Sequence, residues 1–173
     1  MLHIETSGLV EMVGPAVGDL VERGVKSVAV LATEATCRSG MYRAACAEQR
    51  IECVEISCPT LASLIENGAP EVEISAAVDA AVASIPSDIR DVLLGCTHYP
   101  LAFDTFRRAA NASPRRLTFI DPSQAVAEAA IKLAGVAGEG KTMVVCSKRT
   151  PTFDRFAREM LGVDPSEIAA VSK

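Results

Sequence analysis

The chain has 173 residues, of which 49% are hydrophobic, and its formal net charge is −5. This length allows one sizeable core, or one domain with part of another. No apolar stretch approaches the ~20 residues of a membrane span, and no block of lysine and arginine stands out, so we expect neither a membrane nor a nucleic acid as partner.

Six cysteines are scattered along the chain, which also holds two histidines. No pair of cysteines has C-x-x-C spacing, so the sequence predicts no metal site and no redox disulfide. The N-terminus lacks the basic segment followed by an apolar one that forms a secretory signal. We therefore predict a soluble, cytoplasmic protein whose cysteines are reduced and mostly buried.

Helices and strands are predicted to alternate from residue 14 onward. Gly14 and Pro15 open the first helix, and the continuous apolar run at 28–32 is typical of a parallel strand covered on both faces. The predicted elements of this part are helix 14–24, strand 28–32, loop 33–36, helix 40–49 with Ser39 as N-cap, strand 51–56, and helices 60–67 and 70–85.

The second part begins with the apolar strand 92–94, which stops at Gly95. The predicted elements that follow are helix 101–110, strand 117–120, helix 121–137, turn 138–140, strand 142–146, and helix 152–161 closed by Gly162. The polar stretch 111–116 breaks the pattern. We predict an α/β protein with a doubly wound, parallel-sheet (Rossmann-like) domain at 13–112 and an incomplete second α/β domain at 113–173.

A thiol, a hydroxyl and an imidazole follow the strand 92–94 directly, as Cys96, Thr97 and His98. Ligands of open α/β sheets bind just beyond the carboxyl ends of strands. A neighbouring helix N-terminus or histidine would lower the pKa of Cys96, which suits a nucleophile or a proton-transferring base. We interpret this cluster as half of an active site, in which His98 orients or protonates a ligand. The alternatives are a buried strand-end cysteine and a structural histidine.

Thr33 and Thr36 follow the strand 28–32, where hydroxyl and free N–H groups suit a carboxylate or a phosphate. Ordinary capping and turn chemistry explains the two threonines equally well. Glu66, taken alone, is typical of a solvated surface charge, and burial is the expected fate of Cys37.

The segment Leu94-Gly95-Cys96-Thr97-His98-Tyr99-Pro100-Leu101 resembles the second active-site motif of the glutamate racemase family, in the aspartate/glutamate racemase superfamily. Segment 32–42, with two threonines and S-G-x-Y, is similar to another part of that family. So are segment 58–68, with C-P-x-L and L-I-E-x-G, and the stretches 119–121 and 153–162. The resemblance covers residues 13 to 173.

The resemblance implies an amino-acid racemase that acts on glutamate without pyridoxal phosphate or a metal. In this family one cysteine removes the α-proton and a second reprotonates the opposite face. By resemblance, Cys96 is the second of these thiols, His98 assists at the substrate, and Glu66 supports that histidine. Thr97, Thr33 and Thr36 match positions around the substrate. The family supplies D-glutamate for peptidoglycan.

The family's earlier motifs, Asp-Ser-Gly, Pro-Tyr-Gly and Cys-Asn-Thr, are absent from this sequence. We therefore expect a chain that matches the C-terminal two-thirds of the family, has little activity alone and leaves the opposing thiol unassigned. A missing N-terminal portion or a homodimer would complete it. The open alternatives are a non-catalytic module that binds a small dicarboxylate or pairs with a partner chain, a split-enzyme subunit, and an isomerase for another acidic substrate.

Overall fold

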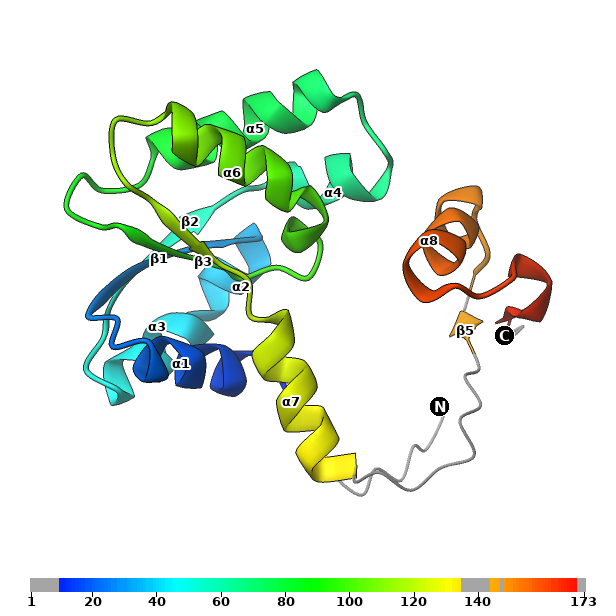
Figure 1. Ribbon diagram of the computed structural model, residues 1–173, viewed down its shortest axis with the longest axis horizontal. Coiled ribbons are helices and arrows are strands. Elements are labelled where there is room, and N and C mark those ends of the chain that lie inside the picture. The colour runs from blue at the N-terminus through cyan, green and yellow to red at the C-terminus, as the bar shows by residue number, and fades with distance from the viewer. Residues whose placement is uncertain (1–9, 135–143, 147, 171–173) are drawn as a thin grey trace. The chain divides into compact units, whose positions relative to one another are not determined.

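The computed structural model describes residues 10–134, 144–146 and 148–170 (Figure 1). The chain forms two compact units, residues 1–135 and residues 136–173. Within the described residues, no helix is both long and apolar enough to cross a membrane.

The first unit is built on a four-stranded parallel sheet with the strand order β2-β1-β3-β4. The strands are β1 (Ser27–Ala32), β2 (Glu52–Ser57), β3 (Asp91–Leu94) and β4 (Thr118–Ile120). The two central strands, β1 and β3, are almost wholly apolar and buried, as strands covered on both faces must be.

Helices cover both faces of this sheet (Figure 1). The helices of the first unit are α1 (Val13–Glu22), α2 (Glu34–Ser39), α3 (Met41–Glu48), α4 (Leu61–Glu66), α5 (Glu71–Ala83), α6 (Phe103–Ala112) and α7 (Ser123–Ala134), with a 3₁₀ turn η1 (Tyr99–Ala102) before α6. Helices α4, α5 and α6 pack on one face, and α1 and α3 pack on the other. The predicted α/β class with a parallel sheet is confirmed.

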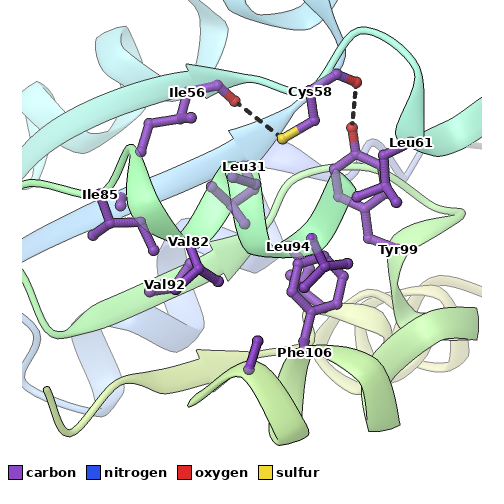
Figure 2. Close-up of a cluster of buried hydrophobic side chains, with 14 of the residues drawn as sticks. Leu31, Ile56, Cys58, Leu61, Val82, Ile85, Val92, Leu94, Tyr99 and Phe106 are labelled. Atoms are coloured by element: carbon purple, nitrogen blue, oxygen red, sulfur yellow. Dashed lines mark hydrogen bonds between the residues drawn. The ribbon is translucent and has the colours of Figure 1, made fainter. Parts of the chain in front are cut away.

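The larger core lies between the sheet and the α4–α6 layer (Figure 2). Leu31 and Leu94 from neighbouring strands contribute to it together with Val82 of α5 and Phe106 of α6, and all four are buried. Each such side chain contributes about 1.5–3 kcal/mol when it leaves water. This packing fixes the strand ends from which the site residues project.

The second unit is small. A short parallel pair, β5 (Val145–Cys146) and β6 (Ala169–Ala170), accompanies helix α8 (Pro151–Leu161) and a 3₁₀ turn at Pro165–Glu167. Thr150 caps α8, since its hydroxyl accepts a hydrogen bond from the N–H of Phe153 at 3.1 Å. The predicted closure by Gly162 is confirmed, with this residue in the left-handed conformation at φ 65°.

The prediction of a loop at 33–36 is wrong, because α2 begins at Glu34 with Thr33 as its N-cap. Ser39 is not the N-cap of α3 either. Gly40, at φ 65°, ends α2 and starts α3. The signals of α2 were present in Thr33, in the acidic Glu34 of its first turn and in the basic Arg38 of its last turn. The predicted turn 138–140 and residues 142–143 of the predicted strand 142–146 lie outside the described residues, and the end of that strand is observed as Val145–Cys146.

Strand β4 pairs with β3, and helix α7 packs against α1. In this structure residues 118–134 therefore lie with the first sheet, and the two compact units divide after residue 135. The predicted division into a domain at 13–112 and a second, incomplete domain at 113–173 stays a prediction.

Candidate active site

The candidate site lies where the carboxyl ends of β1 and β3 meet, which we call the carboxyl edge. Strand β1 pairs with β2 on one side and with β3 on the other, so the strand order reverses between β1 and β3. Leu31 is in register with Leu94, so the two strands end side by side. Ligands of open α/β sheets bind in the crevice at such a switch point.

Gly95 brings the segment after β3 unusually close to β1. Its N–H donates to the carbonyl oxygen of Leu31 at 2.8 Å. A Cβ atom at this position would lie 2.7 Å from Cγ1 of Val30 and 3.2 Å from the carbonyl oxygen of Leu31. Only glycine fits here without displacing the neighbouring strand, so Gly95 places Cys96 against the end of β1.

Cys96, His98 and Glu66 form a chain of side chains along the carboxyl edge. Sγ of Cys96 lies 4.0 Å from Nδ1 of His98. Nε2 of the same ring lies 3.8 Å from Oε2 of Glu66, which stands at the end of α4. The imidazole is half-buried and the carboxylate is exposed. The structure thus brings together three of the predicted site residues, with Cys96 near one ring nitrogen of His98 and Glu66 near the other.

The predicted lowering of the Cys96 pKa is wrong. Burial raises the pKa of this thiol above its ordinary value, and the backbone N–H groups of His98 and Tyr99 offset the rise only in part. The reason is physical: a half-buried thiolate loses hydration, and the turn that follows is a short 3₁₀ segment rather than the N-terminus of a long helix. In the absence of a ligand Cys96 is therefore a neutral thiol at pH 7.

Thr33 and Thr36 lie at the end of β1 on the same edge. Their hydroxyl oxygens are 2.9 Å apart, and the N–H of Thr36 donates to Oγ1 of Thr33 at 3.3 Å. Capping of α2 thus occupies part of this pair, as the alternative interpretation of these residues expected. Both side chains remain partly exposed, and Thr97 is exposed between Cys96 and His98.

The sequence did not predict a buried hydrogen bond between Tyr99 and Cys58, next to the candidate site. The hydroxyl of Tyr99, which is fully buried, donates to the carbonyl oxygen of Cys58 at 3.2 Å (Figure 2). Burial also raises the pKa of the Cys58 thiol to about 11, so this thiol stays protonated. No pattern in the sequence links two residues so far apart, although both fall within the motifs quoted above.

Other features of the described residues do not point to a metal or to a second site at this edge. Those residues contain no group of three or more His, Cys, Asp and Glu side chains that could hold a metal ion. A cavity of about 370 Å³ lies between α1 and α7, and one of about 400 Å³ lies at the amino ends of the strands. Both are remote from Cys96.

Residues 8–130 match the model of the Asp/Glu/Hydantoin racemase family. The chain belongs to this family. It is 27% identical over 153 residues to the glutamate racemase of Aquifex aeolicus (strain VF5), a match that covers 87% of this chain and 59% of that protein. This racemase-family chain thus spans less than two thirds of the length of that relative.

Solved structures share the fold. The crystal structure of glutamate racemase isoform RacE1 from Bacillus anthracis superposes with a TM-score of 0.78 at 22% identity, over 99% of this chain and 66% of that one. Glutamate racemase from Francisella tularensis, in complex with D-glutamate, gives a TM-score of 0.76 at 20% identity, over 94% of this chain and 63% of that one. At these identities the likeness establishes the racemase-family fold.

Proposed function

We propose that this chain carries one side of a glutamate racemase active site, at which the α-proton of glutamate is transferred without a cofactor or metal. The observation that carries the proposal is the thiol–imidazole pair of Cys96 and His98, 4.0 Å apart at the switch point of a racemase-family sheet. A thiol and an imidazole in such a place are suited to proton transfer.

In this proposal Cys96 exchanges a proton with one face of the substrate Cα. The neutral thiol delivers a proton directly, and it removes one after ionising. A substrate α-ammonium within about 4–6 Å would favour the thiolate and offset the burial that raises the Cys96 pKa. Glu66 holds the His98 ring, and Thr33, Thr36 and Thr97 supply hydroxyl and N–H donors to the substrate carboxylate.

Inversion needs an acid on the opposite face of Cα. We propose that a further N-terminal segment or a second copy of the chain supplies it. On this view residues 13–112 form one α/β domain and residues 113–173 belong to the other. The product would feed peptidoglycan synthesis in the cytoplasm.

The test is the incubation of the chain with D-glutamate in deuterated water. ¹H NMR follows loss of the α-proton signal, and chiral chromatography follows formation of L-glutamate. We expect slow exchange with retention of configuration and little or no inversion. Cys96→Ala should abolish the exchange, whereas Cys146→Ala, in the second unit, should not.

Two results would contradict the proposal. Exchange that persists in Cys96→Ala would remove this thiol from the chemistry, and fast exchange with racemisation would show that the opposing acid is already present in this chain.

One observation favours a non-catalytic alternative, in which the chain only binds a small dicarboxylate. Burial keeps Cys96 as a neutral thiol, a poor base. Titration calorimetry with D-glutamate separates the two functions, because a binding module would bind D-glutamate equally well with or without Cys96 and would never exchange its α-proton.

A further inference from the structure

The hydrogen bond between Tyr99 and Cys58 joins two segments that carry different parts of the candidate site. Tyr99 directly follows His98, and its ring packs near that of Phe106, with 6.2 Å between centroids. Cys58 directly follows β2 and leads, through Pro59 and Thr60, into α4. Figure 2 shows the tyrosine hydroxyl directed at the Cys58 carbonyl group.

Helix α4 carries Glu66 at its end, and the packing of α4 against η1 is tight. Leu61 is fully buried and Ile65 nearly so, and both belong to the core that also holds Tyr99. Two residues, Pro59 and Thr60, connect this helix to Cys58, whose carbonyl oxygen accepts the hydrogen bond from Tyr99. A shift of that segment would move the Glu66 carboxylate relative to the His98 ring.

The Glu66–His98 pair needs such a support. The Glu66 side chain is 62% exposed and that of His98 34%. An exposed pair of this kind gains little by itself, because holding two side chains in one geometry costs conformational entropy. Its 3.8 Å separation therefore depends on where the two backbones place the side chains.

We propose that Tyr99 is a positioning residue, whose buried hydroxyl bond to the Cys58 carbonyl keeps His98 within reach of Glu66. The inference rests on the proposed site but not on racemisation. It assigns to Tyr99 a role in the orientation of the imidazole in addition to its packing in the core.

The test is the rate at which diethyl pyrocarbonate acylates His98 at a single pH, measured by peptide mass spectrometry. The chain has two histidines, so His3 serves as an internal reference for reagent concentration. Acylation takes place at a free ring nitrogen, and the Glu66 carboxylate, a charged acceptor, lies 3.8 Å from Nε2 of His98. Glu66→Gln, which removes that charged acceptor, should therefore accelerate acylation of His98.

We expect Tyr99→Phe to accelerate His98 acylation by about two- to fivefold, the range for an exposed pair of this kind. In the Glu66→Gln background the same substitution should have no effect. Tyr42→Phe is the matched control, since this buried tyrosine packs in the core on the opposite face of the sheet. It should leave the rate unchanged.

Two results would overturn the proposal. One is an unchanged rate in Tyr99→Phe, and the other is an equal acceleration with and without Glu66, which would mean that Tyr99 only limits reagent access.

Circular dichroism verifies folding, and Tyr99→Met replaces Tyr99→Phe if the latter does not fold, with the same expectations. Because acylation involves no turnover, its outcome is independent of the D-glutamate exchange experiment.

Discussion

Glu66 and His98 meet at the carboxyl edge with 3.8 Å between Oε2 and Nε2, although one ends α4 and the other follows β3. An exposed pair of this kind contributes at most about 1 kcal/mol to stability. We expect Glu66→Gln to change the free energy of unfolding by less than about 1 kcal/mol while it slows α-proton exchange by about two- to fivefold. Urea unfolding and exchange of D-glutamate in deuterated water measure the two effects. An equal loss in both would assign Glu66 a structural role.

Gly95 is predicted to tolerate no side chain. Its added Cβ would meet Val30 and the backbone of Leu31, and overpacking of this kind costs about 1–3 kcal/mol. We expect Gly95→Ala to destabilise the chain by that amount in urea unfolding. The control is Gly18→Ala in α1, where a Cβ meets nothing within 4 Å. It should stabilise the chain by about 0.5–1 kcal/mol, and a neutral Gly95→Ala would contradict the close approach of the two strands.

Arg43 and Glu55 form an ion pair whose carboxylate is buried. The Glu55 side chain is 5% exposed, and its Oε2 accepts from Nη2 of Arg43 at 2.7 Å. Removing one partner of a buried pair leaves an uncompensated charge. We expect Arg43→Met to cost about 2–4 kcal/mol in urea unfolding, and Arg43→Met combined with Glu55→Leu to recover much of the loss. Arg38→Met, which breaks an exposed pair with Glu34, should cost less than about 0.5 kcal/mol.

Alkaline pH should destabilise the chain through Cys58. Burial raises its pKa from 9.0 to about 11 in the folded state, so the unfolded thiol ionises first. Stability is therefore complete below about pH 9 and falls as the pH rises toward 11, by about 3 kcal/mol for this group. Urea unfolding from pH 8 to 11 measures the decline. The decline should be shallower in Cys58→Ala, and equal slopes would contradict the assignment.

The raised pKa of Cys96 should slow the reaction of this thiol with alkylating reagents at neutral pH. Because burial raises its pKa, iodoacetamide should alkylate Cys96 more slowly at pH 7.5 than it alkylates a small free thiol, with a rate that rises with pH beyond 9. D-glutamate should change this rate if it binds beside the thiol. Peptide mass spectrometry resolves Cys96 from the buried Cys58, and rapid alkylation of Cys96 at neutral pH would contradict the raised pKa.

Local pattern was enough to predict most elements of the fold. The apolar runs predicted β1 and β3, and helical spacing predicted α5, because each depends on residues close together in the chain. The prediction from local pattern failed at α2, where the composition indicates a loop. Capping by Thr33, with acidic Glu34 in the first turn and basic Arg38 in the last turn, stabilises a helix there. The prediction also missed β6, a strand of two residues that forms only by pairing with β5.

The sequence by itself determined the α/β class, the family and the place of the Cys96–His98 cluster at a strand end. Only the tertiary structure decided that Glu66 reaches His98, that Tyr99 bonds to Cys58 and that burial raises the pKa of Cys96. The difference is physical: strand and helix formation is governed by neighbours in the chain. Desolvation and the distance between charges depend on segments that the fold brings together from remote positions.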